Sequence, residues 1–468
     1  MRAQQPQTAA LDPGRARDWL ATQVSQAMKA ASTASPAFPR CLRFEAPVVH
    51  MDALDWLRAQ QADHSVYWAG RDGLEQIAGV EVAHVLAGDD GNLESAFTAL
   101  QRCLTPAHPR LRYYGGIAFN PAREPSAEWQ PFGRYRFILP RFQLENRGTQ
   151  SYLVCTVLLR SATDCEEESE RTLAGLDALK FPENVVPESL PVPEQRQDQP
   201  DSAAWEPLIA AALEAIRRDH LAKVVLSRRT VFSFNAPLDP LALLRRIQAR
   251  TPASYAFCFR LGADTAFLGA TPERLYHRQG RRVASEAIAS TRPRGATDPE
   301  DAALARELLA CDKDRREHAF VVRAIEEVFE RLCRSVDGTR EISVLKLPNC
   351  QHLWCPLEGI LNDGVSDAAL VQALHPSPAV GGVPTDRAVE FIRKQEPFDR
   401  GWYAGPVGWV GPESSEFAVA IRSGLVRGET LSLYSGAGIV AGSTPGGEWD
   451  EVETKLSNAL SALTGDHD

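Results

Sequence analysis

S-A-A-W-E-P-L-I-A-A-A-L-E-A-I-R-R-D (202–219) is followed, three residues later, by K-V-V-L-S-R (223–228). The first segment carries apolar residues at spacings of three and four, which is typical of an amphipathic helix. They are Trp205, Leu208, Ile209, Ala212, Leu213 and Ile216. The second segment contains three successive apolar residues and predicts a strand. This junction marks a change in the predicted secondary structure, because the residues before it predict mainly strands.

Short apolar runs separated by turn residues fill the region from about 41 to 160, and they predict an extended, largely antiparallel sheet. The clearest runs are 65–70, 113–119, 135–142 and 151–159. After 228 the pattern predicts a helix near 238–250, a strand pair through 255–277, a long helix from about 299 to 334, strands around 403–441 and a closing helix from about Glu448. Helices and strands do not alternate strictly, so an α+β fold is favoured over a doubly wound parallel sheet.

The division of the chain follows one proline-rich segment. Residues 181–201 contain five prolines together with Glu, Gln and Asp, which predicts a linker. We therefore expect a β-rich half over 1–200 and a second region over 201–468, intertwined in one structural domain. Residues 1–40 are rich in Ala, Gln and Pro and are expected to be frayed or loosely helical.

Composition excludes several classes of protein. The net charge of −10 argues against nucleic-acid binding, which needs a basic surface. The first forty residues show no basic segment followed by an apolar one, so no signal peptide is expected, and no apolar run reaches the ~18 residues that a membrane span requires. Nine cysteines without a CxxC pair indicate reduced, buried thiols rather than zinc or disulfides. A cytoplasmic protein without membrane contact is expected.

The closing segment E-W-D-E-V-E-T-K-L (448–456) raises a question about charge. On a helix, Glu448, Glu451 and Lys455 share one face, and the two carboxylates repel each other. Asp314 and Glu317 repeat this spacing in an earlier predicted helix. That pattern alone is compatible with a solvated face whose acids pair with nearby arginines.

Taken together, the two acidic helices could converge on one hard divalent cation. Mg²⁺ accepts oxygen ligands and often uses only one or two protein carboxylates. Glu317 and Glu451 would suffice, and Lys455 would then hold an anionic substrate bound by the same metal.

Other charges and glycines complete the candidate site. Lys223, Glu273 and Arg422 lie at the ends of apolar strand patterns, where surface or turn positions are the alternative. Three glycine-rich stretches, 375–384, 403–410 and 434–443, could admit a ligand close to the backbone or simply form tight turns. None has the spacing of a Walker A or dinucleotide loop.

Residues 205–460 resemble the chorismate-binding enzymes, which include isochorismate, salicylate, anthranilate and aminodeoxychorismate synthases. The motifs that carry the resemblance, in chain order, are L-A-K-V-V-L-S-R, G-A-T-P-E-R-L, A-I-A-S-T-R-P-R-G, K-D-R-R-E-H, H-P-S-P-A-V-G-G, R-G-W-Y-A-G-P-V-G-W, A-V-A-I-R-S-G, G-A-G-I-V and E-W-D-E-V-E-T-K. The resemblance implies stacked antiparallel sheets flanked by helices, Mg²⁺ as cofactor and a site between the sheets.

The resemblance also implies a role for individual residues. Glu317 and Glu451 look like the Mg²⁺ ligands, with Glu448 beside them. The other expected substrate contacts are Arg422 and Tyr403 at the enolpyruvyl carboxylate, Lys455, Gly436 and Gly438 at the ring carboxylate, and His352, Ala379 and Thr291 nearby. Ser290 stands where the family usually has glycine, which adds a side chain near the ring carboxylate.

The reaction implied is addition of water to chorismate at C2 with loss of the C4 hydroxyl. Lys223 matches the general base that activates water, and Glu273 matches the acid, with Glu286 as the alternative acid. Both roles require shifted pKa values, which burial can supply. Ala289 stands where aminodeoxychorismate synthases carry a nucleophilic lysine.

The expected product is therefore isochorismate, destined for menaquinone or for siderophore and salicylate biosynthesis, with menaquinone favoured. Ala379 differs from the threonine usual in salicylate synthases, which go on to eliminate pyruvate. That activity and a non-catalytic chorismate-binding relative remain the alternatives. A monomer without a glutamine amidotransferase subunit is expected.

Overall fold

Twenty strands form one hydrogen-bonded network in the computed structural model, which describes residues 10–33, 39–88, 92–182, 190–337, 341–346 and 350–464. Every pairing between these strands is antiparallel. The prediction of an α+β fold with largely antiparallel sheets is thereby confirmed.

The network divides into two arms at β5 (Tyr135–Arg147), which pairs with β3, β4 and β6. The first arm runs through β3 (Glu75–Gly88), β2 (His64–Ala69), β9 (Tyr255–Leu261), β10 (Thr265–Thr271), β19 (Ser423–Arg427) and β20 (Thr430–Ile439) to β8 (Lys223–Ser233), with β7 (Gln195–Gln199) and β16 (Gly382–Val383) beside β8. The second runs through β4 (Tyr113–Ile117), β17 (Pro406–Val410), β18 (Ser414–Val419), β11 (Arg274–Gln279) and β12 (Arg282–Pro293) to β15 (Cys350–Leu361), with β13 (Cys333–Asp337) and β14 (Ser343–Lys346) beside β15. From β5, β6 (Gln150–Leu159) leads to β1 (Arg40–Val48).

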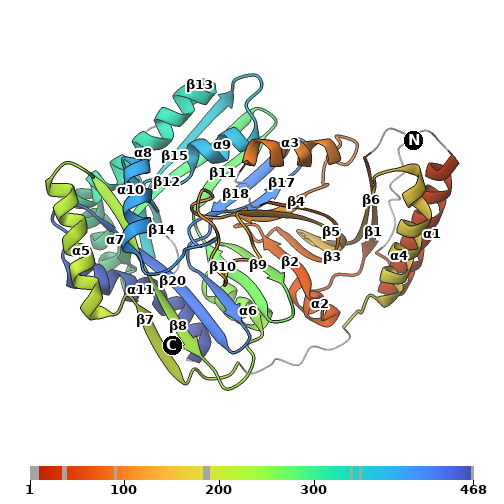
Figure 1. The fold of residues 1–468 in the computed structure, drawn as a ribbon, viewed down its shortest axis with the longest axis horizontal. Coiled ribbons are helices and arrows are strands. Elements are labelled where there is room, and N and C mark those ends of the chain that lie inside the picture. The colour runs from red at the N-terminus through yellow and green to blue at the C-terminus, as the bar shows by residue number, and fades with distance from the viewer. Residues whose placement is uncertain are drawn as a thin grey trace.

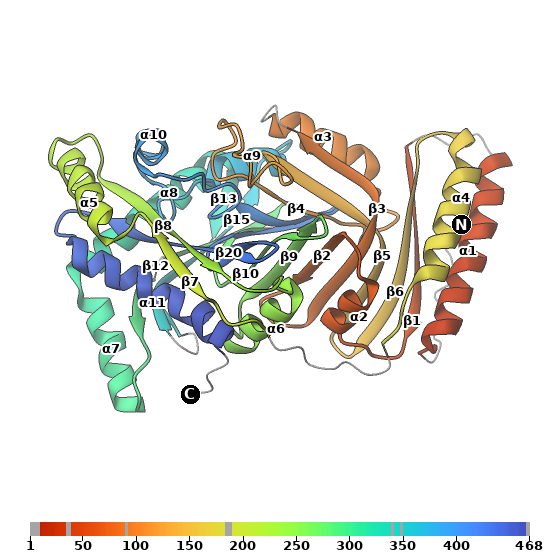
Figure 2. The same ribbon diagram turned by 60° about the horizontal axis from the view of Figure 1, so that its bottom comes forward.

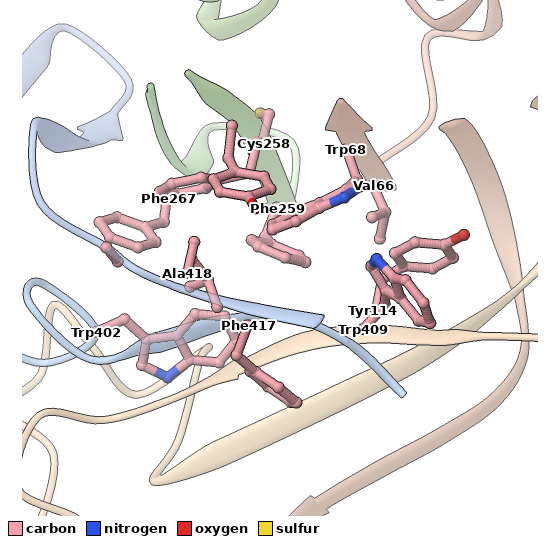
Figure 3. Close-up of a cluster of buried hydrophobic side chains, with 14 of the residues drawn as sticks. Val66, Trp68, Tyr114, Cys258, Phe259, Phe267, Trp402, Trp409, Phe417 and Ala418 are labelled. Atoms are coloured by element: carbon pink, nitrogen blue, oxygen red, sulfur yellow. The ribbon is translucent and has the colours of Figure 1, made fainter. Parts of the chain in front are cut away.

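Aromatic side chains fill the space between the two arms (Figure 3). Trp68, Phe259 and Phe267 come from the first arm, and Tyr114, Trp409 and Phe417 come from the second. The Trp402 ring, in the loop before β17, lies 5.6 Å from the Phe259 ring. Large aromatic rings bury much apolar area each, so this cluster holds the arms together.

Helices lie at both ends of the sheet network and beside its middle (Figure 1). They are α1 (Pro13–Thr33), α2 (Ala53–Gln60), α3 (Leu93–Cys103), η1 (Ala162–Asp164), α4 (Cys165–Ala178), α5 (Ser202–Arg217), α6 (Pro240–Arg250), α7 (Asp298–Ala310), α8 (Asp312–Leu332), α9 (Asp367–Leu374), α10 (Thr385–Gln395) and α11 (Pro445–Thr464). At one end α1 and α4 pack side by side against β1 and β6, and at the other α8 and α11 lie over β12 and β20 (Figure 2). None of the described helices combines the length and apolar character that a membrane crossing requires.

Three local expectations need correction. The helix expected from about 299 to 334 is two helices, because Cys311 adopts an extended conformation between α7 and α8. The C-terminal end of the expected linker forms strand β7, which pairs with β8, while 183–189 lie outside the described residues. The region expected to contain only strands also forms α2 and α3, each begun by an Asx N-cap.

Both arms contain strands from before and after residue 200. β2 pairs with β9, and β4 pairs with β17. The boundary at 200/201 stays a prediction, and these pairings favour the view that its two sides form one structural unit.

Candidate active site

Two of the places where the chain crosses between the two arms lie next to each other. It leaves β10 for β11 through Pro272 and Glu273, and it returns from β18 to β19 through residues 420–422. The amide of Val419 donates to the Glu273 carbonyl at 3.0 Å, and the amide of Ala270 donates to the Arg422 carbonyl at 3.2 Å. Glu273 and Arg422 are therefore brought together by the sheet topology.

A cavity lies at this meeting point, and it contains nearly the whole predicted site. The predicted residues that line it are Lys223, Glu273, Glu317, His352, Ala379, Tyr403, Arg422, Gly436, Gly438, Glu451 and Lys455. Glu448 lies on α11 outside this lining. The side chain of Thr291 is outside the described part of the chain, although its backbone pairs with His352.

Strands β8 and β20 and helix α11 form one wall of the cavity. Lys223 begins β8, whose Val225 and Ser227 face Gly438 and Gly436 of β20. Helix α11 returns across β20, and Lys455 Nζ donates to the Gly436 carbonyl at 2.9 Å. A Cβ at Gly438 would overlap Glu317 Oε1 and lie 3.1 Å from Lys223 Cε. Glycine is thus required for side chains from β8 and α8 to approach this strand.

The face of α11 predicted from spacing is present, and lysines accompany its acids. Lys455 Nζ lies 2.7 Å from Glu451 Oε1, and Lys313 Nζ of α8 lies 3.2 Å from Glu448 Oε1. Glu453 points the other way and pairs with Arg228 at 2.5 Å. Burial alone would raise the pKa of Glu451, but the positive charge of Lys455 opposes burial and the pKa is lowered. Burial raises the pKa of Glu448.

Lys223 and Glu317 form a further pair inside the cavity. The Lys223 side chain is 1% exposed, and its Nζ lies 2.9 Å from Glu317 Oε1. Glu317 Oε2 accepts a long hydrogen bond of 3.4 Å from the Ser290 hydroxyl. Asp314 does not join the site, because it pairs with Arg292 at 2.6 Å.

The carboxylates suit a hard divalent cation in chemistry and in position. Glu317 and Glu451 line one cavity with Lys223 and Lys455, and Gly438 leaves room for the Glu317 carboxylate. Among the described residues no three His, Cys, Asp or Glu side chains are grouped closely enough to ligate one metal. Because Mg²⁺ often takes one or two protein carboxylates and completes its shell with water and substrate oxygens, two carboxylates fit it.

Glu273 is buried between the arms and is held as an acid. Burial, followed by the negative charge of Glu286, raises its pKa to about 8, against the opposing charges of Lys223, Lys455 and Arg422. A carboxyl group with this pKa is protonated at neutral pH and can donate a proton to a leaving oxygen.

Arg422 presents a cation to the cavity. Its backbone φ is +51°, a left-handed conformation that a side chain adopts at a cost, and such strain often accompanies a functional site. Arg422 forms no ion pair with a carboxylate of the described residues; its Nη2 donates to His352 Nε2 and Cys350 Sγ, both at 3.4 Å. A partly buried guanidinium without an acidic partner is suited to an anionic ligand.

His352 is neutral and has a defined tautomer. Burial, then the charge of Arg422, lowers its pKa to about 3. Its Nδ1 lies 3.0 Å from the Ser290 carbonyl oxygen, which can only accept, so Nδ1 carries the proton and Nε2 accepts from Arg422. His352 therefore orients Arg422 without adding charge.

Tyr403 and Ala379 close the remaining side of the cavity. The Tyr403 ring stacks on Tyr434 with centroids 5.1 Å apart, and burial raises the pKa of its hydroxyl. Ala379 belongs to the loop 375–381, where its amide donates to Ser377 Oγ at 3.3 Å. These residues shape the cavity without adding a charge at neutral pH.

Ser290 occupies a position that favours glycine. Its φ is +59°, and the register of β12 against β15 shifts between Ala289 and Thr291, so Ser290 is the bulged residue. Its hydroxyl also donates to the Asp314 carbonyl at 3.3 Å. The serine thus accepts backbone strain while contacting Glu317.

Replacing Ser290 with glycine is expected to give a more stable protein than replacing it with alanine. Both replacements lose the two hydroxyl contacts, but alanine keeps the left-handed strain and glycine removes it, a difference of about 1 kcal/mol. Urea unfolding of the two variants measures it. Equal midpoints for Ser290→Gly and Ser290→Ala would show that the positive φ carries no cost here.

Two contributors to the site were not found from the sequence. Arg71, in the turn between β2 and β3, contacts the Pro272 carbonyl at 2.9 Å and pairs with Glu286. Glu286 does not line the cavity, which disfavours it as the alternative acid. Lys313 was visible in K-D-R-R-E-H, but its pairing with Glu448 depends on how α8 and α11 cross.

Comparison with known proteins places the chain in a family. The family model described as "Chorismate binding enzyme" matches residues 26–464. The chain belongs to the chorismate-binding enzymes, and the resemblance inferred from its motifs is confirmed.

Two relatives within this family are named isochorismate synthases. Isochorismate synthase 2, chloroplastic, of Arabidopsis thaliana is 34% identical over 96% of this chain and 85% of its own length. Isochorismate synthase MenF of Escherichia coli (strain K12) is 31% identical over 95% of this chain and 99% of its own.

Solved structures agree with this assignment. The structure described as MenF, the menaquinone-specific isochorismate synthase from Escherichia coli, superposes with a TM-score of 0.83 at 30% identity, covering 95% of this chain and 99% of that one. Anthranilate synthase component I from Streptococcus pneumoniae gives 0.67 at 20% identity, over 82% and 92%, and shows the same fold.

Proposed function

We propose that this enzyme is an isochorismate synthase, which converts chorismate to isochorismate by adding water at C2 and expelling the C4 hydroxyl. One observation carries the proposal: a buried lysine and a buried, protonated glutamate line one cavity with an arginine that has no acidic partner among the described residues. The names of the relatives support it.

Lys223 is the proposed base and Glu273 the proposed acid. In this role Lys223 Nζ takes a proton from water as the water oxygen attacks C2. The ring double bonds shift, the C4–O bond breaks, and Glu273 gives its proton to the departing oxygen, which leaves as water. One water is consumed and one is released, so the overall change is an isomerisation.

The charged residues around this pair are proposed to hold the two carboxylates of chorismate. Arg422 and Tyr403 would bind the enolpyruvyl carboxylate, because the guanidinium has no competing acid among the described residues. Lys455 and the backbone at Gly436 and Gly438 would bind the ring carboxylate. Ala379, His352 and Thr291 would complete the walls.

Glu317 and Glu451 are proposed to hold Mg²⁺, with Glu448 beside them. The cation would neutralise the ring carboxylate and anchor it against these glutamates. This answers the question raised by the acidic face of α11, because carboxylates that repel one another bind a cation well.

The remaining proposals concern the protein as a whole. Lys223 and Ala289 favour water over ammonia as nucleophile, so no glutamine amidotransferase subunit is proposed. We propose a cytoplasmic monomer whose product feeds menaquinone biosynthesis. One relative, from Pseudomonas aeruginosa, is named for salicylate biosynthesis, so the product's fate is open to test.

A product assay tests the function. With chorismate and Mg²⁺, and without ammonia or glutamine, the purified protein is expected to yield isochorismate and no pyruvate, measured by chromatography. EDTA is expected to abolish turnover, and added Mg²⁺ to restore it. Salicylate with pyruvate would assign the lyase branch instead, and tight chorismate binding without turnover would identify a non-catalytic relative.

A further inference from the structure

Arg71 reaches the active site from the other side of the proline-rich segment. It lies in the turn between β2 and β3, where Asp72 Oδ1 accepts from the amide of Leu74 at 3.0 Å. Its guanidinium, whose side chain is 23% exposed, donates from Nη1 to Glu286 Oε1 at 2.5 Å and from Nη2 to Glu286 Oε2 at 3.2 Å. This two-point contact fixes the relative orientation of the two groups.

The pair holds the backbone on both sides of Glu273. Arg71 Nη1 also donates to the carbonyl of Pro272 at 2.9 Å, which belongs to the peptide group before Glu273. Glu286 Oε1 accepts from the amide of Arg274 at 3.1 Å, which belongs to the peptide group after it. Trp354 Nε1 donates to Glu286 Oε2 at 3.1 Å and fixes the carboxylate from β15.

The same pair acts on the charge of the acid. Glu286 is buried and faces Glu273 as a like charge, which favours the protonated form of Glu273. The opposing cations that face Glu273 are Lys223, Lys455 and Arg422. Glu286 therefore counteracts three cations that the substrate site places around its acid.

We infer that Arg71 and Glu286 are a positioning pair for the catalytic acid: they clamp the Pro272–Arg274 turn and aim Glu273 at the substrate. The inference rests on the proposed role of Glu273. It gives the residues before the proline-rich segment a part in catalysis, although Arg71 contacts no reacting atom.

Three variants separate this role from a purely structural one. Glu286→Gln removes a negative charge beside Glu273, so the basic limb of the kcat/KM profile should move to lower pH by about one unit. Arg71→Ala leaves the Glu286 charge uncompensated, so the limb should move to higher pH. Arg71→Lys keeps the charge but loses the two-point contact, so kcat should fall roughly 10- to 100-fold with the limb unmoved.

A matched control lies on the adjacent strand β11. Arg278 pairs with buried Asp367 at 2.7 Å, and neither residue lines the cavity. Arg278→Ala is expected to lower the unfolding temperature without moving the limb. The pKa of Glu273 can also be measured without turnover, by infrared titration of the protonated carboxyl stretch; the band of Glu273 is the one that disappears in Glu273→Gln. Thermal unfolding verifies that each variant is folded.

The outcomes distinguish failure of the proposed function from failure of the positioning pair. Wild-type protein that forms no isochorismate would reject the proposed function. Wild-type turnover with limbs that stay in place in both Glu286→Gln and Arg71→Ala would reject the positioning pair while leaving the function intact. Opposite shifts in these variants, with a limb near the wild-type pH in the double variant Arg71→Ala/Glu286→Gln, would establish it.

Discussion

Lys223→Ala is expected to lower the rate of isochorismate formation by roughly 10²- to 10⁴-fold, the usual contribution of a positioned general base. Lys223 Nζ is a buried basic group that lines the cavity, and alanine cannot take a proton. Its loss also leaves Glu317 without its partner at 2.9 Å, which alters the proposed metal site. Steady-state kinetics with chorismate, combined with calorimetric measurement of chorismate binding, separates loss of the base from the change at the proposed metal site.

The control for this variant is a lysine–acid pair outside the cavity. Lys346 Nζ lies 2.7 Å from Asp301 Oδ2, and Lys346→Ala should leave kcat near the wild-type value. If Lys223→Ala retained more than a tenth of wild-type kcat, another group would have to be the base. Loss of chorismate binding with unchanged kcat would reassign Lys223 to substrate binding.

Glu273→Gln is expected to have an effect of similar size, roughly 10²- to 10⁴-fold on kcat, and to change the pH dependence. In the wild-type enzyme the acid is active in its protonated form, and its pKa is raised to about 8. Wild-type kcat/KM should therefore fall as pH rises through about 8. Glutamine cannot give up a proton at any of these pH values, so its residual activity should lack this limb.

A neighbouring, partly buried glutamate provides the comparison. Glu416 accepts a hydrogen bond from the Tyr255 hydroxyl at 2.8 Å and does not line the cavity. Glu416→Gln should retain both the turnover and the basic limb. A limb that persists in Glu273→Gln would show that a different group supplies the proton.

Much of the candidate site was predictable because its residues break the local pattern. Lys223, Glu273 and Arg422 are charges at the ends of apolar strands, and in the structure they face one cavity. The shared face of α11 followed from helical spacing alone. Some elements, such as α5, α6 and β8, were also predictable to within a few residues from local periodicity, whereas α2, α3 and β7 were not.

The features that could not be predicted depend on long-range contacts. The pairings of β2 with β9 and of β4 with β17 leave no trace in local periodicity. The contact of Arg71 with Glu286 follows from those pairings. The positive φ of Ser290 follows from a bulge between β12 and β15. A serine where the family usually has glycine indicates this bulge only once the partner strand is known.

The pairing of β8 with β20 has a consequence for synthesis of the chain. Val225 pairs with Gly438, so the strand that carries Lys223 leaves the ribosome long before its neighbour does. Until β20 follows, β8 presents this edge unpaired to other nascent chains, and such edges promote aggregation. The active-site cavity therefore cannot form before β20 and α11 are synthesised. A stalled chain that lacks them is prone to aggregate and is not a partly active enzyme.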